Sequence, residues 1–172
     1  MVFAMGNFEA LKALENTWYL VASSDLLFTG EAVEDPVIRL AISRLEAPTL
    51  LSGYFKFKKK GYYQVLPFTL ELTGATGEFF RLRWQQRLFT RTYQVKIVFL
   101  AQHESLLWYQ EARWLSPAVA HLICATPHPE PNRLKAFWND LPSSDKAACI
   151  SLNLKPCVQR CERAGLTFLT ST

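Results

Sequence analysis

The sequence lacks long apolar runs and the common catalytic signatures. No apolar run approaches the roughly 18 residues that a membrane-spanning helix requires. There is no glycine-rich phosphate loop, no Gly-x-Ser-x-Gly nucleophile elbow and no His-Glu-x-x-His motif. These absences argue against a helical membrane protein and the enzyme classes that such motifs mark. The first five residues are too short for the apolar region of a secretory signal, so we expect a cytoplasmic protein, with a trimmed leader as the alternative.

Histidine and cysteine are few and scattered. None of the three histidines (His103, His121 and His128) lies near Cys157 and Cys161, which are four residues apart. A structural zinc site needs about four ligands, so we expect no metal and no other cofactor. His121 and Cys124 lie in one apolar segment, which favours a structural histidine and a small buried thiol. Without a leader the four cysteines are expected to be free thiols, although their even number also permits disulfides.

Charge is sparse and not clustered in blocks. Charged residues make up 20% of the chain, the net charge is +4, and lysines and arginines alternate with apolar residues. This distribution gives little support to a nucleic-acid footprint, so we expect no nucleic-acid partner. With 172 residues, 49% of them hydrophobic, the chain has the size and composition of one globular domain.

A period-two alternation of apolar and polar residues dominates the chain. It predicts eight strands, over residues 18–23, 37–45, 52–59, 62–72, 78–86, 90–101, 105–111 and 118–125. A long loop, residues 24–36, follows the first strand, and most later connections are short turns of the hairpin type. Consecutive antiparallel strands with such turns predict an all-β fold, either an up-and-down barrel or a sandwich.

Two helices are predicted to flank the strands. Asn7 is expected to cap a short helix that runs to Asn16. Asn132 is expected to cap a second helix, and its apolar stripe has helical spacing: Leu134, Phe137, Trp138 and Leu141. So large an apolar stripe must pack on something, and the outer wall of the barrel is the surface available. Residues 142–172 form a tail with no assigned structure.

Short motifs in this frame resemble the signatures of the lipocalin family. The run Asn16-Thr17-Trp18-Tyr19-Leu20-Val21-Ala22 is similar to the first signature, Gly-x-Trp-Tyr-x-x-Ala, and Ala125-Thr126-Pro127 to the third, Arg-x-Pro. Asn16 replaces the family's glycine, Ala125 replaces its arginine, and the central signature is reduced to His103-Glu104-Ser105. The chain is thus similar to a divergent lipocalin or a relative in the calycin superfamily, over residues 8–141.

The resemblance implies one lipocalin-like β-barrel domain over residues 1–172. Within it we expect an eight-stranded antiparallel up-and-down barrel over about 16–126, a packed helix over about 132–141 and a tail over 142–172. The family's tryptophan closes the narrow end of the barrel, which predicts a structural role for Trp18. Such barrels bind and transport or sequester small apolar molecules, so we expect a fatty acid, retinoid, carotenoid or tetrapyrrole as the partner. The oligomeric state does not follow from the sequence.

Alternation separates the faces of each strand without help from the family. Charged residues belong in water, so the uncharged face points inward. The expected ligand-binding residues are Phe55, Phe57, Phe68, Leu70, Phe80, Leu82, Trp84, Tyr93, Val95, Ile97 and Tyr109. Alternation alone fits a filled core as well as a cavity, because an eight-stranded barrel is narrow enough to be filled by side chains.

A lipocalin-like enzyme, such as an isomerase or a chromophore lyase, is the alternative function. Such enzymes use scattered cavity residues, and Glu71, Glu78 and Glu104 are the candidates here. A solvated surface position is the other interpretation of these three carboxylates.

The loops at one end of the barrel carry several cations. Because connections alternate between the two ends, the segments 24–36, 58–61, 87–91 and 112–117 should surround one opening. Its rim is expected to contain Lys59, Lys60, Arg87, Arg91 and Arg113. A positive rim would attract a carboxylate or phosphate head group, or dock the mouth peripherally on an anionic membrane. The alternative is that these lysines only keep a sheet edge soluble.

Overall fold

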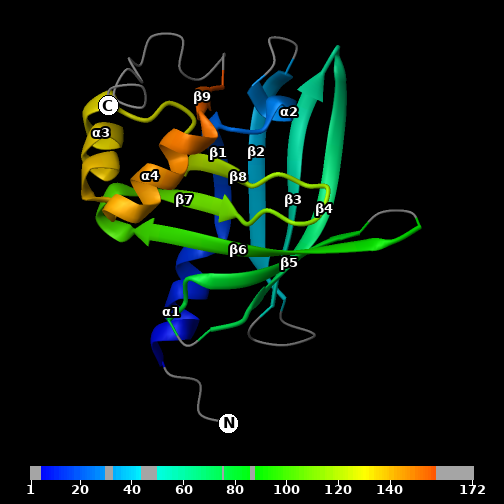
Figure 1. Ribbon diagram of the computed structural model, residues 1–172, viewed down its shortest axis with the longest axis horizontal. Helices are drawn as coiled ribbons and strands as arrows, with labels where there is room; N and C mark the ends of the chain where they lie inside the picture. The colour runs from blue at the N-terminus through cyan, green and yellow to red at the C-terminus, as the bar shows by residue number, and fades with distance from the viewer. Residues whose placement is uncertain (1–4, 30–32, 44–49, 75, 86–87, 158–172) are drawn as a thin grey trace.

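The computed structural model describes residues 5–29, 33–43, 50–74, 76–85 and 88–157 (Figure 1). Eight strands form the barrel: β1 (Asn16–Ser23), β2 (Val33–Ile42), β3 (Leu50–Lys59), β4 (Tyr62–Leu72), β5 (Phe79–Gln85), β6 (Thr90–Leu100), β7 (Ser105–Gln110) and β8 (Val119–Cys124). The other elements are α1 (Met5–Leu14), α2 (Leu26–Thr29), the 3-10 turn η1 (Ala101–His103), α3 (Pro131–Asp140), α4 (Ser143–Leu152) and β9 (Lys155–Pro156). None of the helices in these ranges is long and apolar enough to cross a membrane.

Strand β1 closes the barrel by pairing on both sides. Each strand from β2 to β7 pairs antiparallel with the next one in sequence. The first half of β1, from Asn16 to Tyr19, pairs with β2, and its second half pairs with β8. The register shifts between Leu20 and Ala22, and β9 then pairs with the last residues of β1. The predicted eight-stranded up-and-down barrel is confirmed.

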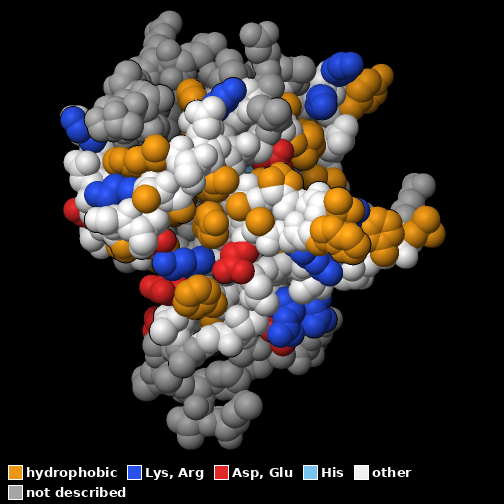
Figure 2. Space-filling model, in the orientation of Figure 1, with side chains coloured by type: hydrophobic (Ala, Val, Ile, Leu, Met, Phe, Trp, Pro, Cys, Tyr) orange, Lys and Arg blue, Asp and Glu red, His pale blue; other side chains and the backbone are white. Residues whose placement is uncertain are grey.

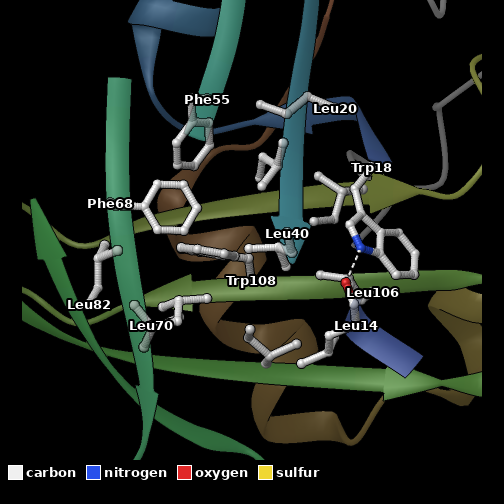
Figure 3. Packing of buried hydrophobic residues seen from close by; sticks show 14 of the residues in the cluster. Leu14, Trp18, Leu20, Leu40, Phe55, Phe68, Leu70, Leu82, Leu106 and Trp108 are labelled. Atoms are coloured by element: carbon white, nitrogen blue, oxygen red, sulfur yellow. Dashed lines mark hydrogen bonds between the residues drawn. The ribbon is translucent and has the colours of Figure 1, made fainter. Parts of the chain in front are cut away.

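The barrel interior is packed with the side chains that alternation assigns to the inner face. Figure 3 shows Phe55 of β3, Phe68 and Leu70 of β4, Leu82 of β5 and Trp108 of β7 gathered in the interior. Ten of the eleven residues predicted to face inward belong to this inner cluster or pack against it: Phe55, Phe57, Phe68, Leu70, Phe80, Leu82, Trp84, Tyr93, Val95 and Ile97. The inner face of the barrel is therefore as predicted at these positions.

Helix α1 covers the narrow end of the barrel. Its Leu11 and Leu14 are buried in the inner cluster. The indole Nε1 of Trp18 donates a hydrogen bond to the Leu14 carbonyl oxygen at 2.9 Å, and the ring lies edge-on to Phe99 at 5.8 Å (Figure 3). Trp18 therefore ties the first strand to the helix that closes this end, and the predicted structural role is confirmed.

A second apolar cluster covers the outer wall, over β7, β8 and β1. The predicted stripe of α3 is buried here, together with Cys149 of α4. An ion pair of 3.0 Å between Lys96 Nζ and Asp145 Oδ1 joins α4 to β6. Two expectations are corrected: α3 begins at Pro131 after Glu130 rather than at an Asn132 cap, and the tail that had no assignment contains α4 and β9. Proline at the first helical position needs no amide hydrogen, which explains this start.

The wall separates at the end opposite α1. The hairpin of β3 and β4 is paired along its whole length, but the described residues of β5 pair only with Phe68–Leu72 of β4. Pro67, which has no amide hydrogen to donate, lies where this pairing stops. On the other side, β6 pairs with β7 only from Val95 onward. The end of the barrel is thus built from separate hairpins.

The predicted loop 24–36 also contains α2, and β2 begins at Val33 rather than residue 37.

Candidate functional site

A cavity of about 710 Å³ opens at this separated end of the barrel. Its wall comes from α2 and the segment before it, Phe55 of β3, the middle of β4, the end of β5, the start of β6 and the end of β7. The segment that leads into β8, the first residues of β8 and the last residues of α4 complete it. Ligand sites for small molecules in proteins have volumes of about 300 to 1,000 Å³, so this cavity is large enough for one. The barrel is thus filled at its narrow end and hollow at the other.

Aromatic rings form the floor of the cavity. Phe55 stacks on Phe28 of α2 at 5.2 Å and on Trp84 of β5 at 5.3 Å between ring centroids. Phe68 and Trp108 lie under Phe55 at 5.3 and 5.8 Å. Rings held at these distances by strands on different sides of the barrel make an apolar aromatic surface.

His121 of β8 is the buried polar side chain at the inner end of the cavity. Its Nδ1 lies 2.7 Å from Ser23 Oγ, which also accepts a hydrogen bond from the Asp25 amide at 3.0 Å. The rings of Phe28 and Phe55 lie 5.5 and 5.7 Å from the imidazole. Burial lowers the pKa of His121 to about 3, so its imidazole is neutral at physiological pH.

Two polar atoms at this inner end lack a partner among the described residues. Ser23 Oγ forms a hydrogen bond with Nδ1 of His121, and no described residue forms one with its Nε2. The buried Nε1 of Trp108, whose ring lies 6.4 Å from the imidazole, also has no described partner. A pKa near 3 makes His121 a weak base, so the Ser23–His121 pair is poorly suited to activating a nucleophile. The arrangement suits hydrogen bonding to a bound molecule better than catalysis.

The mouth of the cavity is held by contacts between β6 and the segment before β8. The Tyr93 hydroxyl lies 3.2 Å from Ser116 Oγ. The Arg113 guanidinium lies over the Tyr93 ring at 5.9 Å and donates to the Thr92 carbonyl. Arg91, which lines the cavity, lies over the Phe89 ring at 5.1 Å.

The predicted cationic rim is only partly assembled. Of its five members, Arg91 lines the cavity and Arg113 fixes the neighbouring turn. Lys59 and Lys60 lie at the tip of the β3–β4 hairpin and do not line the cavity. Arg87 lies outside the described residues.

The predicted ligand-binding residues divide between the cavity and the core. Phe55, Trp84 and Tyr93 line the cavity. Seven others fill the barrel around and below it: Phe57, Phe68, Leu70, Phe80, Leu82, Val95 and Ile97. The prediction that Tyr109 points inward is wrong, because it packs against the outer cluster while its neighbour Trp108 occupies the inner face.

Sequence reasoning missed several cavity residues. Phe28 lies on a helix within the predicted loop, and Gln110 ends β7. His121 was assigned a structural role, although strand alternation puts it on the same face as Ile123, a residue of the inner cluster. A polar residue on the inward face of a strand was thus the available signal.

The three candidate catalytic glutamates do not line the large cavity. Glu71 pairs with Arg81 and Arg83 at 3.3 and 3.8 Å, and Glu78 is exposed. Glu104 lines a smaller cavity of about 230 Å³ beside α3, together with Cys124, whose thiol pKa is raised to about 11 by burial. Within the described ranges, no three metal-ligating side chains come together.

Comparison with known proteins was informative only at the level of structure. No family model and no curated protein matches the sequence. Insecticyanin from the tobacco hornworm Manduca sexta is similar with a TM-score of 0.58 and 13% identity, over 78% of this chain and 77% of that chain. The siderocalin Ex-FABP is similar with a TM-score of 0.53 and 12% identity, over 74% of this chain and 83% of that chain. Both are lipocalins. The closed barrel, the aromatic cavity and these two likenesses together show that the chain has the lipocalin fold, in a strongly divergent sequence.

Proposed function

We propose that the protein binds, and thereby transports or sequesters, one small and mostly apolar molecule in the 710 Å³ cavity. The observation that carries this proposal is a cavity with an aromatic floor and a neutral, buried histidine at its inner end. Removing an apolar molecule from water at such a floor is favourable, at roughly 25 cal/mol per Å² of buried apolar surface. The likeness to a siderocalin that "functions through dual ligand specificities" supports a binding role for a barrel of this shape.

The polar groups of the cavity favour a particular ligand chemistry. At the inner end, Nε2 of neutral His121, to which no described residue bonds, suits a hydroxyl or carbonyl group. A carboxylate there would lose its hydration without meeting a positive charge. At the mouth, Arg91 offers that charge. The ligand therefore has an apolar body with a neutral polar group at its buried end, and any anionic group lies outermost. An elongated retinoid, carotenoid or fatty acid derivative fits this description.

Titration with retinol, followed by tryptophan fluorescence, tests the proposal. Trp84 lines the cavity, so a bound ligand should quench its emission with a stoichiometry of about 1:1. The variant Trp84→Phe should lose most of this quenching, and Trp138→Phe, on the outer cluster, should keep it. Quenching that is lost in Trp138→Phe instead would place the ligand on the outer wall.

A blocking variant gives a readout that does not depend on fluorescence. Ala118 lines the mouth and is half-buried, so Ala118→Trp adds bulk without changing the barrel interior. It should weaken retinol binding measured by calorimetry, with little effect on the melting temperature. Native mass spectrometry of the purified protein would identify a retained molecule. Unchanged affinity in Ala118→Trp would contradict the proposed site.

A further inference from the structure

A tight turn beside the cavity mouth presents two large apolar side chains to solvent. Trp114 and Leu115 are each 90% exposed. The flanking Arg113 and Ser116 exchange backbone hydrogen bonds of 2.9 and 2.7 Å, so both apolar residues stand at the tip of a closed turn. Leu115 has a φ of 65°, in the left-handed region that favours glycine or asparagine. The turn thus holds an apolar residue where neither solvation nor backbone preference favours one.

The turn is anchored on its inner side. Arg113 donates to the Thr92 carbonyl and lies over the Tyr93 ring, and Ser116 Oγ is 3.2 Å from the Tyr93 hydroxyl. These contacts fix the base of the turn against β6. The side chains of Trp114 and Leu115 therefore project from a turn whose base is held in place.

The neighbouring hairpin adds two more exposed apolar residues. Leu88 is 92% exposed and Phe89 is 50% exposed, and both precede the start of β6, where the turn is anchored. We refer to Leu88, Phe89, Trp114 and Leu115 as the apolar tip. Figure 2 shows hydrophobic side chains gathered where this hairpin projects from the barrel. Scattered exposed apolar residues are ordinary, but a group of four at the entrance of a cavity marks an interaction surface.

Cations lie directly behind the apolar tip. The Arg91 guanidinium lies over the Phe89 ring and the Arg113 guanidinium over the Tyr93 ring, and neither forms an ion pair with a described residue. Glu111 is the exposed acidic residue that precedes the turn. Apolar and aromatic side chains in front of arginines match the layers of a bilayer surface, where acyl chains lie under a layer of phosphates.

We propose that the apolar tip docks the cavity mouth on an anionic lipid bilayer. Trp114, Leu115, Leu88 and Phe89 enter the interfacial layer, and Arg91 and Arg113 contact lipid phosphates. The exposed Lys60 and the half-buried Lys59 at the β3–β4 hairpin tip add attraction to the same anionic surface. This mode of docking does not require a ligand in the cavity, and it would let an apolar molecule pass between bilayer and barrel without crossing water.

Sedimentation with lipid vesicles tests the proposal. Vesicles of phosphatidylcholine with about one quarter phosphatidylglycerol should bind the protein, and pure phosphatidylcholine should bind it more weakly, since each cation contributes near an anionic surface. Binding should also shift the tryptophan emission to the blue. Trp18, Trp108 and Trp138 are already buried, so this shift should be lost in Trp114→Phe or greatly reduced.

Leu115→Gly separates docking from structural damage. Glycine tolerates the positive φ, so this variant should melt at a higher temperature than the wild type yet bind the anionic vesicles about tenfold more weakly. Phe79→Ser is the matched control, because Phe79 is 42% exposed on β5 at the far end of the same hairpin. It should leave vesicle binding unchanged.

Three results would overturn the proposal. The first is vesicle binding by Leu115→Gly that is as strong as that of the wild type, and the second is a loss of vesicle binding in Phe79→Ser equal to that in Leu115→Gly. The third is a concentration-dependent dimer in analytical centrifugation that Leu115→Gly abolishes. That dimer would assign the apolar tip to a second copy of the chain. Retinol titration of Leu115→Gly keeps this test separate from the proposed ligand site: unchanged titration with lost vesicle binding supports docking, whatever the cavity binds.

Discussion

The buried His121 predicts a specific loss of stability in acid. Its pKa in the folded protein is about 3, against 6.5 for a solvated imidazole. Between these values the unfolded chain binds a proton that the folded chain does not. The stability is therefore fully present above pH 6.5 and falls as the pH falls, by about 1.4 kcal/mol per pH unit. From pH 6.5 to 4.5 this one residue should cost about 2 kcal/mol of unfolding free energy.

Urea unfolding of wild type and His121→Gln, measured between pH 7.5 and about 4.5, isolates this contribution. Carboxylates titrate in both proteins, so the difference in unfolding free energy removes them to first order. That difference should be flat above pH 6.5 and should shift toward the variant at lower pH with the slope given above. Ser23→Ala is the matched control, because it removes the hydrogen bond but keeps the imidazole. It should cost about 1 kcal/mol and still show the wild-type slope.

A difference between wild type and His121→Gln that does not change with pH would refute this reasoning. It would mean that the imidazole accepts its proton in the folded protein as readily as in the unfolded chain. His121 would then be solvated or paired with an acid. The proposal that the ligand carries a neutral polar group at its buried end would then lose its physical basis.

Other substitutions test the faces, the packing and the mouth. Phe80→Asp places a charge on a fully buried inner face and should cost several kcal/mol of unfolding free energy, whereas the half-buried Arg81→Asp should be mild; thermal melts in the opposite order would reverse the assigned faces. Gly53→Ala should cost about 1 to 3 kcal/mol of unfolding free energy and lower the urea midpoint accordingly, because an added Cβ would meet the Arg39 carbonyl oxygen at 2.6 Å. An unchanged midpoint would show that β2 and β3 can move apart there. Arg91→Glu should weaken retinoic acid binding more than retinol binding in calorimetry, and less so in high salt, while equal losses would remove Arg91 from head-group recognition.

Strand alternation predicted the inner face wherever charge marks the outer one. On β5, Arg81 and Arg83 alternate with the buried Phe80 and Leu82, so polarity alone distinguishes the two faces. On β7 this contrast disappears, because helices α3 and α4 cover the outer wall and both faces are apolar. The wrong assignment of Tyr109 to the inner face follows from this burial of the outer face, because the sequence of β7 alone does not indicate that helices pack on it.

The remaining errors have local causes. Helix α4 carries apolar residues without one clear stripe, and β9 has only two residues, so neither produces a periodic signal. The alternation of loops between the two ends of the barrel predicts the residues of the rim, and it places Arg91 and Arg113 at the correct end. It does not predict how far each hairpin extends. Lys59 and Lys60 therefore lie at a hairpin tip beyond the cavity wall, although they were expected at the rim.

The unequal lengths of the hairpins have a consequence for how the protein behaves at high concentration. The part of β4 before Phe68 has no described β5 partner, and its exposed side chains include Tyr62, Tyr63 and Val65. Free peptide groups beside β-prone side chains can template strand addition by another molecule. Three consecutive lysines, residues 58–60, and Pro67 bound this stretch at its two ends. The repulsion between these lysines and the missing amide donor of proline oppose edge-to-edge growth, so the two ends of this stretch counteract aggregation of the protein in solution.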